Sequence, residues 1–245
     1  MKAVGVPAVT PSMAAPLPTT SGVAVVVPAL NCETTIVEVV TQARHVLPNI
    51  FVIDDGSSDA TARLAADAGA EVLSHAQTRG KGAALLTGLD ELARRGYERM
   101  LTMDGDGQHL ADQIPVLLAA SDRAPEALII GTRIMEGVPT TAARLFGNRF
   151  ANRWVEIACG RALPDTQSGF RVYPLPATLE LGATAGRFAF ETEVLILAAR
   201  AGMAITSVPV AVYYPPAAER VSHYRPWADT VRIIAVVVGL ILRRR

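Results

Sequence analysis

A run of apolar residues near the start of the chain, residues 22–27, places the strongest constraint on the fold. The run reads Gly-Val-Ala-Val-Val-Val and ends at Pro28. An apolar stretch without polar interruptions is typical of a strand that is buried on both faces of a parallel sheet. Residues 49–53 repeat the pattern after a helix expected at residues 34–46. The sequence therefore predicts a central sheet with helices on both of its faces.

Strands and helices continue to alternate along the rest of the chain. Further strands are expected at residues 71–74, 99–103, 127–131 and 205–212. Further helices are expected at residues 59–68, 79–95 and 141–159, and others begin near Ala111 and Glu191. This alternation indicates an α/β fold with a doubly wound, mainly parallel, Rossmann-like sheet.

Polar clusters follow three of the expected strands. They cover residues 31–33, 54–59 and 104–109. In open sheets of this kind, ligands bind beyond the carboxyl ends of the strands. The three clusters are therefore expected to line one crevice.

The cluster after the fourth strand contains two carboxylates, Asp104 and Asp106, with Gly105 between them and Gly107 after them. Glycines allow the backbone to turn so that both carboxylates face one point. Two like charges that close together are unfavourable unless a cation lies between them, and Mg²⁺ and Mn²⁺ prefer oxygen ligands. A divalent metal site is one interpretation. The other is an ordinary surface turn, because Asp-Gly pairs are common in turns.

The composition excludes several classes of protein. Lys+Arg and Asp+Glu both number 23, so there is no general electrostatic attraction to nucleic acid. Cys32 and Cys159 are the only cysteines, which is too few for a disulfide framework or a thiolate zinc site and favours the reducing cytoplasm.

The organisation predicted from the sequence is a single domain with two appendages. Residues 1–21, rich in Ala, Pro, Thr and Ser, are expected to form a flexible tail; residues 22–212 form the domain, and residues 213–245 follow it. The last segment contains a loop rich in proline and an apolar helix from residue 228 that ends in three arginines. Its apolar run, residues 233–242, is about half the length needed to cross a bilayer. The helix could pack on the domain, mediate oligomerisation, or lie on the cytoplasmic surface of a membrane.

Five motifs in order give a more specific indication. They are residues 27–31 (Val-Pro-Ala-Leu-Asn), 52–59 (Val-Ile-Asp-Asp-Gly-Ser-Ser-Asp), 80–88 (Gly-Lys-Gly-Ala through Gly88), 103–109 (Met-Asp-Gly-Asp-Gly-Gln-His) and 165–171 (Asp-Thr-Gln-Ser-Gly-Phe-Arg). Together they resemble the inverting family-2 glycosyltransferases of GT-A fold, in the branch similar to dolichol-phosphate mannosyltransferases. The resemblance implies transfer of a sugar from a UDP- or GDP-sugar.

The resemblance also implies roles on the donor side. Asp104 and Asp106 correspond to the DxD motif that binds Mg²⁺ or Mn²⁺ at the donor diphosphate, with Gln108 close by. The residues implied for the nucleotide pocket are Pro28, Asn31, Asp54 and Asp55, while Asp165 and Gln167 are implied to face the donor sugar or the metal. Lys81, beside two glycines at a helix start, has the chemistry of a phosphate or sugar ligand; a solvated lysine is the alternative. Many relatives have Glu directly after the Asn, whereas this chain has Cys32 before Glu33, which leaves the contact of Glu33 open.

Two kinds of acceptor remain open. A polyprenyl phosphate is already anionic and needs cationic partners rather than a strong base, and the candidates are Arg133, Arg144, Arg220 and Arg225. Asn148, four residues after Arg144 and on the same helix face, is an additional candidate for the acceptor phosphate. A hydroxyl acceptor on a glycan or lipid needs a general base, either Glu191 or Glu193, and on a helix only one of these would face the crevice.

The leading hypothesis from the sequence is a metal-dependent glycosyltransferase acting on a lipid-linked acceptor, most simply a polyprenyl phosphate, at the cytoplasmic face of a membrane. The alternatives are transfer to a hydroxyl and a nucleotide-sugar-binding regulator without transfer activity. Surface arginines on a solvated helix would explain part of the acceptor-side pattern equally well.

Overall fold

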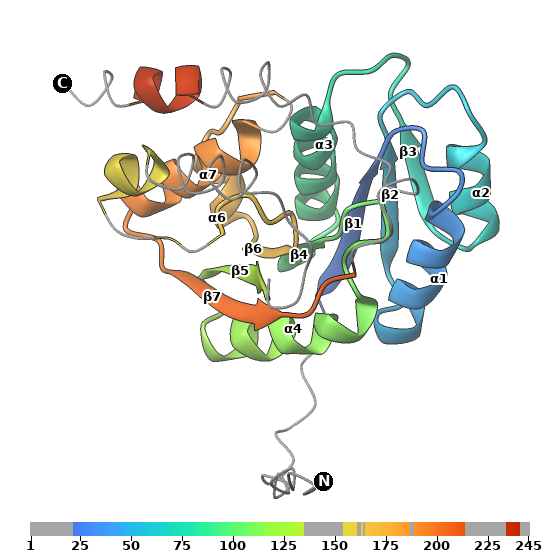
Figure 1. Cartoon of the computed structure of the whole chain (residues 1–245), viewed down its shortest axis with the longest axis horizontal. Helices are drawn as coiled ribbons and strands as arrows, with labels where there is room; N and C mark the ends of the chain where they lie inside the picture. The colour runs from blue at the N-terminus through green and yellow to red at the C-terminus, as the bar shows by residue number, and fades with distance from the viewer. Residues whose placement is uncertain are drawn as a thin grey trace, which may run out of the picture.

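A seven-stranded sheet forms the centre of the protein, with the strand order β3-β2-β1-β4-β6-β5-β7. This computed structural model describes residues 22–134, 154–160, 163, 165–186, 189–213 and 234–240. Helices cover both faces of the sheet, as Figure 1 shows. The α/β fold predicted from the sequence is therefore confirmed.

The elements alternate as the sequence predicts. In chain order they are β1 (Val23–Ala29), α1 (Ile36–Val46), β2 (Ile50–Asp54), α2 (Thr61–Asp67), β3 (Glu71–Ser74), α3 (Lys81–Arg94), β4 (Arg99–Thr102), the 3-10 turn η1 (Ala111–Gln113), α4 (Ile114–Arg123), β5 (Leu128–Arg133), β6 (Arg171–Pro174), α6 (Ala177–Glu180), α7 (Ala189–Arg200) and β7 (Ile205–Val210). Residues 154–159 and 234–240 are also helical. The helix expected near Ala111 begins as η1 and becomes α4 at Ile114, with a proline in its first turn.

The sheet is parallel except at β6. Strand β1 pairs in parallel with β2 and β4, and β2 pairs in parallel with β3. Strand β6 runs antiparallel between β4 and β5, while β7 is parallel to β5. The carboxyl ends of β1, β2 and β4 therefore meet at one edge, where the polar clusters follow.

Strand β1 contributes to both hydrophobic clusters of the core. Val23, Val25 and Val27 face the cluster formed with α1, α2 and α4, whereas Ala24 and Val26 face the cluster formed with α3 and α7. All five of these side chains are completely buried. Full burial of a valine contributes about 1.5–3 kcal/mol, which explains why no polar residue interrupts this strand.

The C-terminal apolar segment packs partly on the domain. In residues 234–240, Val237 and Leu240 are buried in the cluster of α3 and α7, while Val238 is 38% exposed. The longer helix predicted from residue 228 extends outside the described residues and is not confirmed. Within the part of the chain that the structure describes, no helix is long and apolar enough to cross a membrane.

Candidate active site

Backbone and side-chain contacts bring the three polar clusters together at the carboxyl edge of the sheet. The Thr35 hydroxyl donates to the Gly105 carbonyl at 2.6 Å, which joins the segment after β1 to the segment after β4. The Asn31 backbone N–H donates to the Ser57 hydroxyl at 2.9 Å, which joins it to the segment after β2. The three polar clusters that were expected to line one crevice therefore lie next to one another.

Asp104 lies at the centre of this edge and pairs with Lys81. The Lys81 Nζ is 2.7 Å from Asp104 Oδ1 and 3.2 Å from Glu191 Oε1. Burial alone would raise the pKa of Asp104, but the positive charge of the nearby Lys81 lowers it to about 2. Burial likewise opposes the charge of Lys81, yet Asp104 and Glu191 raise the pKa of its ammonium above the usual range. Both charges are therefore present at neutral pH.

Asp106 differs from Asp104. Burial, followed by the negative charge of Asp104, raises the pKa of Asp106 to about 6. Its Oδ1 accepts a hydrogen bond from the Gln108 backbone N–H at 3.0 Å. Ionisation of both carboxylates is thus costly in the metal-free protein, and a cation shared by them would remove that cost.

His109 positions the backbone of Asp104. Its Nδ1 accepts the Asp104 N–H at 3.1 Å, and its ring stacks on Phe170 with a centroid distance of 5.0 Å and an interplanar angle of 16°. Burial lowers the pKa of His109 to about 4, so the ring is neutral at physiological pH. The sequence motif included His109, but it gave no indication of Phe170 as the stacking partner.

Asp55 anchors the loop that leads into α3. Its carboxylate lies within hydrogen-bond distance of His75 Nδ1 (2.7 Å) and accepts the backbone N–H groups of Arg79 (2.9 Å) and Gly80 (2.7 Å). Gly80 has a φ of 96°, a value that favours glycine. The anchored loop places Lys81 at the first position of α3. Asp55 therefore holds the loop; its predicted contact with the nucleotide stays a prediction.

Asn31 and Glu33 build the turn before α2. Asn31 Oδ1 accepts the Ser58 N–H at 2.9 Å, and Asn31 itself has a φ of 50°. Glu33 Oε2 accepts the Ala60 N–H at 3.1 Å. The contact of Glu33 that the sequence left open is therefore with the backbone before α2. The predicted nucleotide contacts of Asn31 and Glu33 stay predictions.

Asp54 and Pro28 lie near the same turn. Asp54 is the last residue of β2, is buried, and accepts the Ser57 N–H at 3.1 Å. Pro28 lies in β1, opposite Ile53 of β2. Both stand at the carboxyl edge, where the resemblance assigns them to the nucleotide pocket.

Arg133 and Asp165 pair with each other. The Arg133 Nε and Nη2 donate to the two Asp165 oxygens at 2.8 and 2.6 Å, and its backbone N–H donates to Oδ2 at 3.0 Å. Asp165 has a φ of 48°. The sequence predicted that Arg133 binds the acceptor and that Asp165 faces the donor or the metal. In the structure the two side chains form an ion pair with each other.

Arg171 holds the loop that carries Gln167. Its guanidinium, completely buried, donates to the carbonyls of Thr166 (2.7 Å), Ser168 (2.8 Å) and Glu191 (2.9 Å). Gln167 is half-buried within this loop. The sequence motif included Arg171 but gave it no role, because its partners are carbonyls that only the folded loop brings together.

The two glutamates of α7 point to different places. Glu191 reaches Lys81, whereas Glu193 Oε2 accepts the backbone N–H groups of Thr184 (2.7 Å) and Ala185 (2.5 Å). Glu191 therefore belongs to the site and Glu193 stabilises a neighbouring loop. Assigning Glu193 as the base is disfavoured by these contacts.

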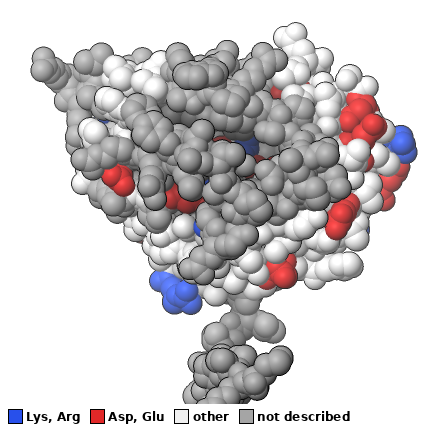
Figure 2. All heavy atoms as spheres, in the orientation of Figure 1, with Lys and Arg blue, Asp and Glu red and all other residues white. Residues whose placement is uncertain are grey.

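Some predicted residues lie outside the described part of the chain, namely Arg144, Asn148, Arg220 and Arg225. Within the described part, no three His, Cys, Asp or Glu side chains form a cluster that could hold a metal by themselves. On the face shown in Figure 2, the described acidic and basic side chains lie in small separate groups.

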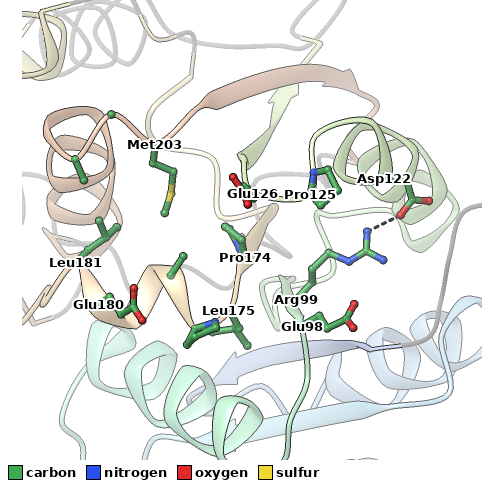
Figure 3. Close-up of a pocket in the computed structure, with 14 residues that line it drawn as sticks. Glu98, Arg99, Asp122, Pro125, Glu126, Pro174, Leu175, Glu180, Leu181 and Met203 are labelled. Carbon is green, nitrogen blue, oxygen red and sulfur yellow. Dashed lines mark hydrogen bonds and ion pairs between the residues drawn. The ribbon is translucent and has the colours of Figure 1, made fainter.

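A pocket of about 990 Å³ lies at the other end of the sheet. Its lining includes Arg99, the first residue of β4, whereas Asp104 follows the last residue of that strand. Figure 3 shows the Arg99–Asp122 ion pair (2.6 Å) at this pocket. None of the predicted site residues lines it, so we do not assign it to the site at the carboxyl edge.

Comparison with known proteins places this geometry in a family context. The chain matches glycosyl transferase family 2 over residues 24–180. It is 33% identical over 202 residues to the glycosyltransferase AglJ of Haloferax volcanii, covering 81% of this chain and 65% of that protein. It is 29% identical over 200 residues to the polyprenol monophosphomannose synthase of Mycolicibacterium smegmatis, covering 76% of this chain and 75% of that protein.

Solved structures share the fold. The glucosyl-3-phosphoglycerate synthase of Mycobacterium tuberculosis, in complex with Mn²⁺, UDP and glucosyl-3-phosphoglycerate, superposes with a TM-score of 0.68 at 23% sequence identity. The match covers 89% of this chain and 79% of that one. At this identity the likeness establishes the fold.

Proposed function

The chain belongs to glycosyl transferase family 2 and is an enzyme that transfers sugar, and we propose that it moves a sugar from a UDP- or GDP-sugar to a polyprenyl phosphate with inversion of the anomeric carbon. The observation that carries the proposal is the meeting of Asp104, Lys81 and Glu191 at the carboxyl edge of the sheet, with Asp106 beside them. The name of the mycobacterial relative supports a polyprenyl phosphate as the acceptor.

The donor set suits a divalent ion that is held jointly by protein and substrate. Mg²⁺ is commonly bound through one or two carboxylates together with substrate phosphates and water. Asp104 and Asp106 would supply the carboxylates, with Gln108 close by in the same segment. When bound, the ion supplies positive charge to the departing nucleoside diphosphate.

The protein's own residues then orient the reactants. Lys81, at the start of α3, can bind donor phosphate because the first N–H groups of a helix and an ammonium both favour anions. Arg133 is held at the end of β5 by Asp165, and a guanidinium at this position suits an acceptor phosphate because its planar fork matches phosphate oxygens. A phosphate acceptor needs no strong base, since its attacking oxygen is already anionic.

Glu191 favours a second candidate, transfer to a hydroxyl. Its carboxylate is buried, belongs to the site and contacts Lys81 at 3.2 Å. As a general base it would accept the proton of an acceptor hydroxyl during attack. With metal and donor both saturating, replacing Glu191 with Gln discriminates the two candidates, because a hydroxyl acceptor loses its base and a phosphate acceptor loses none.

The test is a panel of radiolabelled UDP- and GDP-sugars incubated with the full chain, Mg²⁺ or Mn²⁺, and polyprenyl phosphate in detergent. We expect label to enter the organic phase with one donor, and Asp104→Asn to abolish it. Asp90→Asn is the matched control, because Asp90 is an exposed carboxylate on α3. Donor binding without label in any lipid or glycan acceptor would instead indicate a regulator. We also propose that the enzyme acts at the cytoplasmic face of a membrane, because a polyprenyl phosphate is a lipid.

A further inference from the structure

Lys81 occupies a place beside Asp104 that a metal ion would need. Its Nζ lies 2.7 Å from Asp104 Oδ1, and divalent ions bind carboxylate oxygens at about 2.0–2.6 Å. The Lys81 side chain is 15% exposed and that of Asp104 is 28% exposed. A metal on the same carboxylate would therefore lie within a few ångströms of the ammonium, in a site with little water to screen the repulsion.

Gly169 leaves room for this pair because it has no side chain. A Cβ at position 169 would lie 2.7 and 2.8 Å from the two Asp104 oxygens and 2.8 Å from Lys81 Nζ. The ion pair thus lies directly against the loop of Gly169, which Arg171 holds in place. A larger residue at position 169 would press on both members of the pair.

Glu191 gives the ammonium a second partner. The Glu191 Oε1 lies 3.2 Å from Lys81 Nζ, and the side chain is only 7% exposed. A lysine that loses Asp104 can therefore stay charged and paired by remaining on Glu191. Lysine suits such a change, because its ammonium is a compact charge on a flexible stem.

Building on the proposed function, we propose that Lys81 is a built-in counter-ion of the metal carboxylate: it holds Asp104 in the metal-free protein and shifts onto Glu191 when a divalent ion binds. Glu191 is then a positioning residue for the displaced ammonium. A bare metal ion binds weakly because it must displace Lys81. A metal that arrives with a nucleoside diphosphate binds more tightly, because the diphosphate offers the ammonium further oxygen partners.

The experiment measures Mn²⁺ binding to the full chain by electron paramagnetic resonance, without donor or acceptor. Lys81→Met removes the competing charge and is expected to tighten Mn²⁺ binding by roughly ten- to a thousandfold, given the strength of charge interactions over a few ångströms at a partly buried site. Lys81→Arg keeps the charge and should bind Mn²⁺ no more tightly than wild type. Glu191→Gln removes the alternative partner and is expected to weaken binding.

The opposite signs expected for Lys81→Met and Glu191→Gln exclude a merely structural effect, because loss of structure weakens binding in both. Thermal unfolding in EDTA verifies that each variant is folded. If Lys81→Met does not fold, Glu191→Gln and the UDP dependence of Mn²⁺ binding in wild type still decide. Unchanged or weaker binding in folded Lys81→Met, tighter binding in Glu191→Gln, or no gain from UDP or GDP would each overturn the inference. Absence of sugar transfer would refute the proposed function without affecting these results.

Discussion

Replacing Gly169 with Ala tests whether the position of Asp104 sets the rate of the enzyme. The backbone at this position does not have the positive φ that would forbid alanine. The new methyl carbon would lie 2.7 and 2.8 Å from the Asp104 oxygens, against 3.4–4 Å for an ordinary contact. The end of the flexible Lys81 side chain can move away from the new methyl group at little cost. The Asp104 side chain is short, so its carboxylate must shift from its position to relieve the contact. The variant therefore displaces the proposed metal ligand without removing it.

The expected magnitude follows from these distances. Restoring a normal contact moves the carboxylate by roughly 0.6 Å, and misplacement by about 1 Å costs on the order of a hundredfold in rate. We therefore expect kcat to fall roughly ten- to a hundredfold. Overpacking of this kind usually costs about 1–3 kcal/mol of stability, partly offset by about 0.4–1 kcal/mol from the reduced freedom of the unfolded chain.

Two other glycines provide matched controls. A Cβ on Gly88 would lie 2.8 Å from Val26 Cγ1 in the core, so Gly88→Ala should lower stability but leave kcat per folded molecule unchanged. Gly186 faces open space, so Gly186→Ala should change neither. The assay is transfer kinetics with urea unfolding of each variant. Wild-type kcat in folded Gly169→Ala, or an equal loss in Gly88→Ala, would refute the reasoning.

Three further predictions concern groups near the site. Asp106→Asn should raise the free energy of unfolding in EDTA at pH 8 by roughly 1–3 kcal/mol, because a carboxyl whose pKa is raised to about 6 opposes folding once it is ionised. This gain in stability should shrink as the pH falls through 6 and vanish near pH 4. Urea unfolding at each pH measures it, and a gain that does not depend on pH would contradict the reasoning. Burial raises the pKa of the Cys32 thiol to about 11, so in Cys159→Ser the remaining thiol should react with a disulfide reagent at pH 8 at least about a hundredfold more slowly than in urea; equal rates would contradict this. Arg171→Lys should lower the midpoint of thermal unfolding, since an ammonium cannot reproduce the planar fork that reaches three carbonyls, and an unchanged midpoint would count against that role.

The parts of the fold that the sequence predicts are those determined by local pattern. The apolar run of β1 is a direct consequence of its burial on both faces, and the polar residues after β1, β2 and β4 mark the edge at which parallel strands end. The position of β6 was not predictable in this way. Its short sequence, Arg171–Pro174, gives no sign that it runs antiparallel between β4 and β5.

The sequence predicted which residue types lie at the site but not which of these residues pair with each other. Arg133 and Asp165 are separated by 32 residues, and Asp55 and His75 by 20, so no local spacing links them. The resemblance assigned most of these polar residues to the substrates, the metal or catalysis. In the folded protein several of them serve one another, because a buried carboxylate or guanidinium must be satisfied before the loop that carries it is stable.

Residues that hold the loops are distinct from the charged residues at the centre of the site, and this explains how charges on loops can have fixed positions. Asp55 holds the loop that delivers Lys81, and Arg171 holds the loop that delivers Gly169. The neutral His109 holds the backbone of Asp104. Each anchor acts on main-chain atoms, so it fixes position without neutralising the carboxylate or ammonium that it positions. This arrangement is consistent with the exchange of partners that we propose for the charged groups at the centre, in which a metal ion and a diphosphate enter and leave in every turnover.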